Sequence, residues 1–246
     1  MFGLFVCGEA VARAGHSEGG WSFDPWVWGA FALLFLLRPR RLWLFAGAAG
    51  ALFLALIWPL DALSERSFAA HMAQHMLLIG VAAPLLVLSR PALRFLKGSR
   101  SIRWVSKTSP RTAFAVHAAA IWVGHAPLVI AWTIAYRGAH LLEHVALLGT
   151  ALVFWWTLCR RGRAGYGEAA LWTLVTMLHT GLLGALLTFA PRLLYPGYSL
   201  ADQQLAGLIM WIPGGLCYLA AGLAFAFAWL GAPGAGAADL GHQRHK

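Results

Sequence analysis

The chain has 246 residues, of which 60% are hydrophobic and only 11% are charged. Soluble domains carry about 25% charged residues, so this composition excludes a soluble globular protein and indicates an integral membrane protein. The net charge of +10 does not indicate a nucleic-acid partner, because Lys and Arg collect in short segments between apolar runs, where they set membrane topology. Cys7, Cys159 and Cys217 form no CxxC motif, which argues against a disulfide framework and against a copper shuttle based on paired thiolates.

Apolar runs of about 20 residues predict transmembrane helices, because a helix of that length crosses a hydrocarbon core of about 30 Å. No alternating pattern typical of strands appears, so we expect an all-α membrane protein, a bundle of about seven transmembrane helices spanning 23–230. The expected spans are 23–38, 42–60, 67–89, 111–135, 139–158, 169–190 and 205–230. We expect a short extracytoplasmic tail at 1–22 and a flexible basic cytoplasmic tail at 231–246.

The basic residues predict the orientation of this bundle. With seven spans, 15 of the 19 Lys and Arg residues follow the first, third, fifth and seventh spans, and 4 lie on the other side. The positive-inside rule then predicts that the N-terminus is outside and the C-terminus is cytoplasmic.

Proline interrupts three of the expected spans. A proline inside a helix removes a backbone hydrogen bond and clashes with the preceding turn, so we expect bends or thinning at Pro84, Pro127 and Pro213. Between the sixth and seventh spans, the segments 189–191 and 194–196 predict an amphipathic outer loop, which we interpret as a lid.

Seven histidines lie inside the expected spans, and most fall in the outer half of the bilayer. Ionisable side chains at a helix centre cost roughly 2.5–3.5 kcal/mol on insertion scales, so a cluster of them indicates a function. His71 and His75 are four residues apart and share one helix face, and His140 and His144 repeat that spacing. Two such helices that face each other offer four imidazoles to a metal ion.

Further candidate ligands have a similar expected depth. Glu143, His125 and His179 lie in the outer half, whereas His117 lies towards the cytoplasm and is interpreted as a packing residue. If spans three, five and six build one site, we expect His75, His144 and His179 to lie within a few ångströms of one another.

Methionines near these histidines favour copper, because thioether sulfur selects Cu(I). Copper is therefore the expected metal, with haem as the alternative cofactor, and no catalytic residues are expected. The candidate metal ligands are His71, His75, His140, Glu143, His144, His179, His125, Met72, Met76 and Met177.

Four other interpretations of the same residues stay open. The sequence from His140 to His144 matches the H-x-x-E-H pattern of some zinc proteases, although the pattern is short. Histidines on facing helices also suit bis-imidazole haem ligation, as in a membrane cytochrome or electron carrier. Intramembrane His and Glu can form a proton relay in a transporter, or a structural polar network.

Several longer motifs resemble one family. They are His71-Met-Ala-Gln-His75-Met-Leu-Leu with Ala83-Pro84-Leu-Leu-Val-Leu, His140-Leu-Leu-Glu-His144 with Phe154-Trp-Trp, the run from Met177 to Pro191 with Leu194-Tyr-Pro196, and the run from Asp202 to Gly215. Over roughly 60–230, the chain resembles the CtaG-type cytochrome c oxidase assembly factors of bacteria.

The resemblance implies a multi-pass protein of the bacterial plasma (inner) membrane that helps to assemble a haem–copper cytochrome c oxidase at copper insertion. The partners it implies are the oxidase subunits and an extracytoplasmic copper donor protein, besides membrane lipid. The copper assignment rests on both the resemblance and the His and Met residues. We therefore expect a copper-binding assembly factor, a metal chaperone of the respiratory chain rather than an enzyme.

Overall fold

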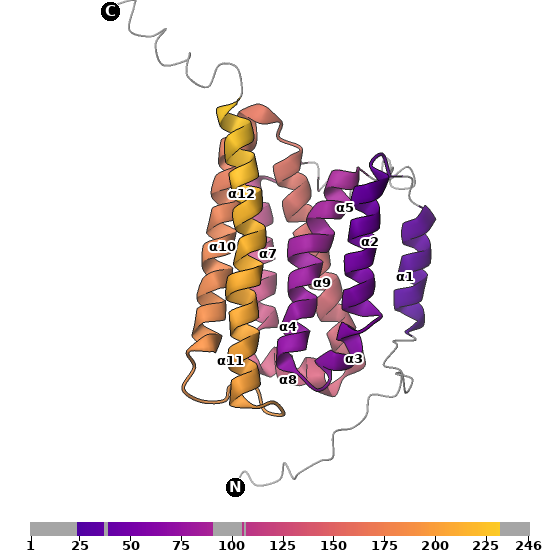
Figure 1. Cartoon of the computed structure of the whole chain (residues 1–246), viewed down its shortest axis with the longest axis vertical. Helices are drawn as coiled ribbons and strands as arrows, with labels where there is room; N and C mark the ends of the chain where they lie inside the picture. The colour runs from indigo at the N-terminus through magenta and orange to yellow at the C-terminus, as the bar shows by residue number, and fades with distance from the viewer. Residues whose placement is uncertain (1–23, 37–38, 91–104, 106, 232–246) are drawn as a thin grey trace, which may run out of the picture.

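A computed structural model of the chain describes residues 24–36, 39–90, 105 and 107–231. Every regular element within these ranges is helical, and the helices form one bundle of roughly antiparallel segments (Figure 1). The elements are α1 (Pro25–Leu36), α2 (Leu42–Leu56), α3 (Leu60–Ser64), α4 (Phe68–Met76), η1 (Leu77–Ala82), α5 (Ala83–Ser89), α7 (Pro110–Gly124), α8 (Pro127–Ala135), α9 (Arg137–Cys159), η3 (Arg163–Gly165), α10 (Tyr166–Thr188), α11 (Leu200–Ile209), η4 (Met210–Gly214) and α12 (Gly215–Leu230).

Five helical segments of the described chain are long and apolar enough to cross a membrane, which makes this a multi-pass membrane protein. They are Leu42–Ser64, Phe68–Ser89, Arg137–Cys159, Arg163–Thr188 and Leu200–Leu230, and the bent pair α7 and α8 gives a sixth if it counts as one span. The helix α1 has 12 residues, or about 18 Å of length at ~1.5 Å per residue, which is less than the ~30 Å core.

The expected count of seven spans is therefore not confirmed, because the first expected span is short and the fourth is broken. The orientation of the bundle stays a prediction. The expected tails at 1–22 and 231–246 lie outside the described residues, apart from Gly231.

The break in the fourth expected span follows from Pro127. Proline forces the residue before it out of the helical region, and Ala126 accordingly has a ψ of 135°. The axes of α7 and α8 differ by 69°. The expected bend is confirmed, and it leaves His125 at the corner as the residue that caps α7.

The other two prolines are accommodated by π-helical turns instead of breaks. The segment η1 precedes Pro84, and η4 contains Pro213. A π turn shifts the backbone hydrogen bonds by one residue, and the helix thereby accommodates the backbone N–H that proline lacks. The spans Phe68–Ser89 and Leu200–Leu230 consequently stay continuous.

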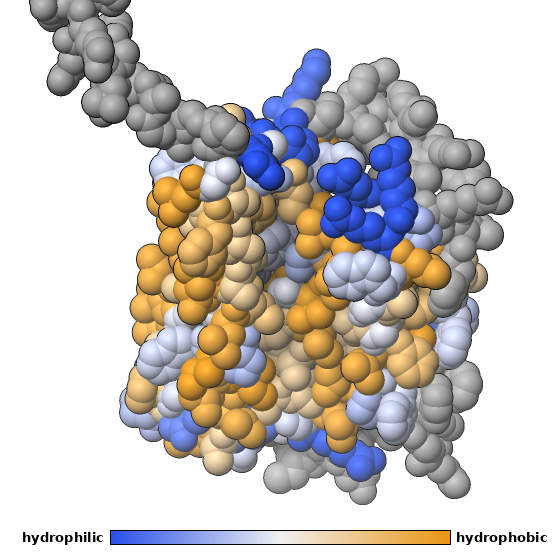
Figure 2. Space-filling view, turned by 45° about the horizontal axis from the view of Figure 1, so that its top comes forward, coloured by the Kyte–Doolittle hydropathy of each residue, from blue (hydrophilic) through white to orange (hydrophobic). Residues whose placement is uncertain are grey.

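The two ends of the bundle differ in polarity. The exposed side chains of Arg40, Arg41, Arg160 and Arg161 lie at the start of α2 and the end of α9, which is the upper end in Figure 1. Figure 2 shows hydrophilic residues gathered at this end, above a mainly apolar flank. The opposite end contains α3, α8 and the starts of α4, α9 and α11 (Figure 1), and the histidine pairs follow shortly after two of these starts.

Candidate metal centre

The helix α4 carries two of the histidines on a buried face. Its start is fixed by Ser67, whose Oγ accepts a hydrogen bond from the Ala70 amide at 3.2 Å, as at an ordinary helix N-cap. His71 and His75 follow one turn apart, with ring centroids separated by 4.4 Å. Both are buried.

A carboxylate from another helix holds the start of α4. Asp202, in the first turn of α11, accepts hydrogen bonds from Ser67 Oγ at 2.8 Å and from the amides of Phe68 and Ala69. These amides have no partner within the helix, and the positive end of the helix dipole favours the carboxylate charge. Asp202 therefore fixes the position of α4, and with it both histidines. The sequence gives no signal for this role, because Asp202 and Ser67 are 135 residues apart.

The helix α9 turns a second group of side chains towards α4. His140, Glu143 and His144 share one face because their spacing is three and four residues, and all three are buried. Glu143 Oε2 lies 3.4 Å from His71 Nε2 and 3.7 Å from His75 Nε2. The carboxylate of α9 thus lies directly against both imidazoles of α4.

The imidazoles of the two pairs are in mutual contact. The ring centroids of His140 and His144 are 4.2 Å apart, those of His71 and His140 are 5.0 Å apart, and those of His75 and His144 are 5.4 Å apart. The structure thus brings both HxxxH pairs together across one helix interface, and each pair shares one helix face, as its spacing predicted. We refer to His71, His75, His140, Glu143 and His144 as the imidazole–carboxylate cluster.

The corner between α7 and α8 adds a fifth imidazole beside this cluster. The ring of His125 lies 5.5 Å from that of His75. Its Nδ1 is 2.7 Å from the carbonyl oxygen of Ile121, and its Nε2 is 3.2 Å from Met72 Sδ. His125 and Met72 are both buried, so one methionine of the predicted set also reaches the site.

The buried nitrogen and oxygen atoms at the centre lack the hydrogen bonds that buried polar groups ordinarily make. Within the described part of the chain, His71 Nε2, both nitrogens of His75 and both oxygens of Glu143 make no hydrogen bond. One ligand atom from each of these three residues lies within 4.8 Å of the others. A cation bound between them would satisfy the carboxylate and the nitrogen lone pairs together, and imidazole donors suit transition metals.

The loop between α10 and α11, interpreted in the sequence as a lid, contacts the residues beside the site. The Tyr195 hydroxyl donates to the carbonyl oxygen of His125 at 2.8 Å, and its ring centroid lies 4.5 Å from that of Phe68. Phe68 in turn stacks on His71. Gln203 Oε1 accepts a backbone N–H of the loop at 2.7 Å. Burial raises the pKa of Tyr195 to about 12, so the hydroxyl keeps its proton at neutral pH.

His179 does not join the imidazole–carboxylate cluster, contrary to the expected approach to His75 and His144. Its ring lies against Phe114 at a centroid distance of 5.5 Å, and its Nδ1 accepts a hydrogen bond from Trp122 Nε1 at 3.3 Å. Both partners belong to α7, so the face of α10 that carries His179 packs against α7 and not against α4 or α9.

His117, interpreted as a packing residue, has polar partners of its own. It is buried, and its Nδ1 lies 3.0 Å from Thr150 Oγ1. Its ring stacks on Phe154.

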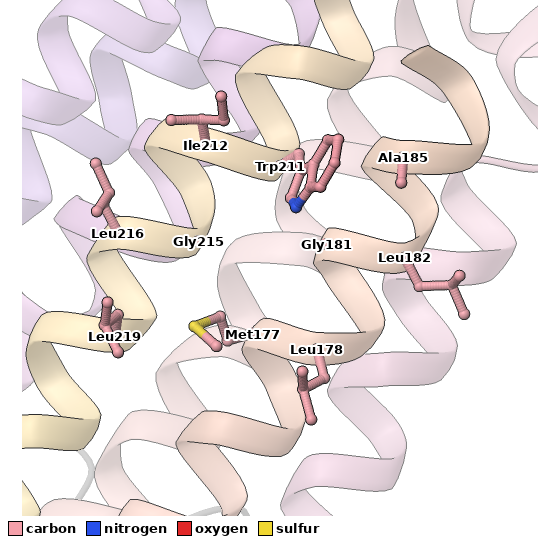
Figure 3. A pocket seen from close by; sticks show the side chains of 10 residues that line it. All are labelled: Met177, Leu178, Gly181, Leu182, Ala185, Trp211, Ile212, Gly215, Leu216 and Leu219. Carbon is pink, nitrogen blue, oxygen red and sulfur yellow. The ribbon is translucent and has the colours of Figure 1, made fainter. Parts of the chain in front are cut away.

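The remaining two methionines of the predicted set also lie away from the cluster. Met76 packs against Gly214, where a Cβ atom would collide with its sulfur. Met177 borders an apolar surface groove of about 410 Å³ between α10 and the segment η4–α12 (Figure 3). Besides Met177, the groove is lined by Leu178, Gly181, Leu182, Ala185, Trp211, Ile212, Gly215, Leu216 and Leu219. It has neither imidazole nor carboxylate and does not resemble a metal site.

These observations define a multi-pass helical membrane protein with a buried imidazole–carboxylate cluster near one end of its bundle. The chain belongs to the cytochrome c oxidase caa3 assembly factor family (Caa3_CtaG), whose model matches residues 28–232. The resemblance noted in the sequence is thereby confirmed, and the role of the family implies an oxidase as the partner. A comparison with curated proteins and one with solved structures give no match to the chain.

Proposed function

We propose that the protein binds a copper ion in the imidazole–carboxylate cluster and delivers it to a subunit of a cytochrome c oxidase. The observation that carries the proposal is that His71, His75 and Glu143 bring buried ligand atoms together, and that these atoms make no hydrogen bond within the described residues. The membership of an oxidase assembly family supplies the acceptor, and copper is a metal that such an enzyme must receive. The protein acts as a carrier, and we assign it no catalytic turnover.

The neutral and charged donors have separate roles in this scheme. A bound cation compensates the buried carboxylate of Glu143, whose charge would otherwise be costly in a dry environment. The imidazoles of α4 and α9 provide directional nitrogen ligands. Because these ligands must be deprotonated to bind, uptake of the ion releases protons or displaces them from the cluster.

Haem fits these residues poorly. A macrocycle held by two histidines must lie between their rings, whereas the facing rings of α4 and α9 are already in contact, with centroids 5.0 Å and 5.4 Å apart. The ligand atoms of His71, His75 and Glu143 lie within 4.8 Å of one another, a spacing that suits a single ion. The protease interpretation is not favoured either. Glu143 lies against two imidazoles and is therefore poorly placed to activate a water molecule.

We further propose that the cluster lies near the outer face of the bacterial plasma membrane. The basic side chains at the ends of α2 and α9 mark the opposite end of the bundle, which the positive-inside rule assigns to the cytoplasm. His140 precedes the end of α9 at Cys159 by 19 residues, or about 28 Å. An extracytoplasmic copper donor would then supply the ion from the outer side, with membrane lipid around the flank.

The test is metal analysis and an absorption spectrum of the full-length protein purified in detergent after expression with copper. The expected result is bound copper without a Soret band. His75→Ala should lose this copper, and His117→Ala, which removes a buried imidazole outside the cluster, should keep it. Stoichiometric haem, or copper that persists in His75→Ala, would contradict the proposal.

A further inference from the structure

The contact between His125 and Met72 is unusual because neither atom in it has an evident proton to share. The Ile121 carbonyl oxygen can only accept a hydrogen bond, so Nδ1 of His125, at 2.7 Å, is the donor. A neutral imidazole carries a single N–H. Nε2 then presents a lone pair, and 3.2 Å away it meets Met72 Sδ, which also presents lone pairs.

Two lone pairs that face each other in a buried environment repel, and a cation bound between or beside them would remove this repulsion. Both side chains are buried, with relative exposures of 4% for His125 and 0% for Met72. A histidine whose Nδ1–H is held by a backbone carbonyl, leaving Nε2 free, is the ordinary arrangement of a metal-bound imidazole. The backbone that fixes this tautomer is the last turn of α7, at the corner made by Pro127.

The separation of the two atoms suits a shared ion. Bonds of ~2.0 Å to imidazole nitrogen and ~2.3 Å to sulfur, as at zinc sites, place nitrogen and sulfur about 3.5 Å apart at the tetrahedral angle of ~109°. The observed 3.2 Å between Nε2 and Sδ is within a few tenths of an ångström of that value, which a small shift of either side chain makes up. Thioether sulfur with imidazole selects the soft, monovalent state of copper over harder divalent ions.

We propose that Met72 and His125 form a second metal position, a thioether–imidazole pair for Cu(I), beside the carboxylate position around Glu143. The proposal rests on the proposed function in that the cargo is copper. His75 connects the two positions: its ring lies 5.5 Å from His125, and its Nε2 lies 3.7 Å from Glu143 Oε2. Its Nδ1, like its Nε2, is buried and has no hydrogen bond within the described residues. An ion can therefore move between the soft and the charged position with one ligand in common.

The experiment uses full-length protein in detergent, loaded anaerobically with Cu(I), with X-ray absorption to detect sulfur at the metal and a chromophoric competitor to measure affinity. Met72→Leu removes the sulfur and keeps the approximate shape of the side chain, and Met76→Leu is the matched control four residues further along the same helix. We expect Met72→Leu to lose a sulfur scatterer and at least about tenfold in Cu(I) affinity, since even an outer-shell partner is worth about 10- to 100-fold.

The Met76→Leu variant and a Glu143→Gln variant should both keep the sulfur scatterer. The comparison of the two leucine variants shows whether Met72 supplies the sulfur, because Cys7, Cys159 and Cys217 also contain sulfur. If Met72→Leu and Met76→Leu give the same spectrum and affinity, the second position is wrong. If copper binds without sulfur and is lost in Glu143→Gln, this inference fails while the proposed function stands. If the unmodified protein binds no copper, the proposed function itself fails.

Discussion

Replacing Glu143 by Gln separates the charge of the cluster from its shape. The carboxylate oxygen lies 3.4 Å and 3.7 Å from two imidazole nitrogens, so an ion between them lies ~2 Å from the charge. At an effective dielectric constant of ~20, a monovalent ion at ~2 Å gains about 8 kcal/mol. Desolvation of both charges offsets much of this gain. Loss of a partner that does not touch the metal already costs up to about 100-fold in affinity, so we expect the Glu143→Gln variant to bind the ion at least about 100-fold more weakly.

The thermal stability of the purified protein measures this loss. An ion at ~100 times its dissociation constant stabilises the folded state by about 2.7 kcal/mol, which corresponds to roughly 5–11 °C in Tm for a chain of this size. After a ~100-fold loss of affinity, the same ion concentration equals the dissociation constant and contributes only about 0.4 kcal/mol, or about 1 °C.

Without metal, Glu143→Gln should unfold at the same or a higher temperature than the unmodified protein, because it removes a buried charge. Glu168→Gln is the matched control: its side chain is 43% exposed and pairs with Arg161 Nη2 at 3.6 Å, at the other end of the bundle. If Glu143→Gln keeps the full metal-induced shift, or if it lowers Tm without metal while Glu168→Gln does not, the cluster is structural and the reasoning is wrong.

Three further predictions concern other parts of the molecule. In cells, His75→Ala should leave the oxidase short of copper and activity, whereas His117→Ala at matched protein level should not; equal effects would point to a scaffold role. Asp202→Asn should lower the free energy of unfolding by about 1–2 kcal/mol, because it weakens charged hydrogen bonds at the start of α4, and an unchanged Tm would show that this contact is dispensable. A reporter fused after Lys246 should indicate cytoplasm and one inserted beside Arg192 should indicate the outside; the reverse pattern would place the cluster at the inner face.

Local rules in the sequence predicted the parts of the site that lie on single helices. The spacing of His71 and His75, and of His140 and His144, gave two faces that the structure brings into contact. Pro127 predicted a bend because its effect on the backbone is local. Depth along each span placed His125 correctly beside the others.

What depth did not predict is the rotation of each helix about its axis. His179 has a suitable depth, but the face of α10 that carries it meets Phe114 and Trp122 of α7. The count of seven spans is not confirmed for a related reason: hydropathy alone does not show that α7 ends at Gly124 or that α1 has only 12 residues. The contact of Asp202 with α4 depends on helix pairing across 134 residues, which no local pattern encodes.

The cover that Tyr195 and Phe68 form over the cluster bears on how long an ion stays, independently of how tightly it binds. With His75 fully buried, exchange needs a transient local opening of the loop or of a helix end. If that opening costs about 4 kcal/mol, the open form is roughly one molecule in a thousand. A competing chelator then meets the ion only in this minor form. A partner that holds the 190–199 loop open would shorten the residence time of the ion without altering a single ligand.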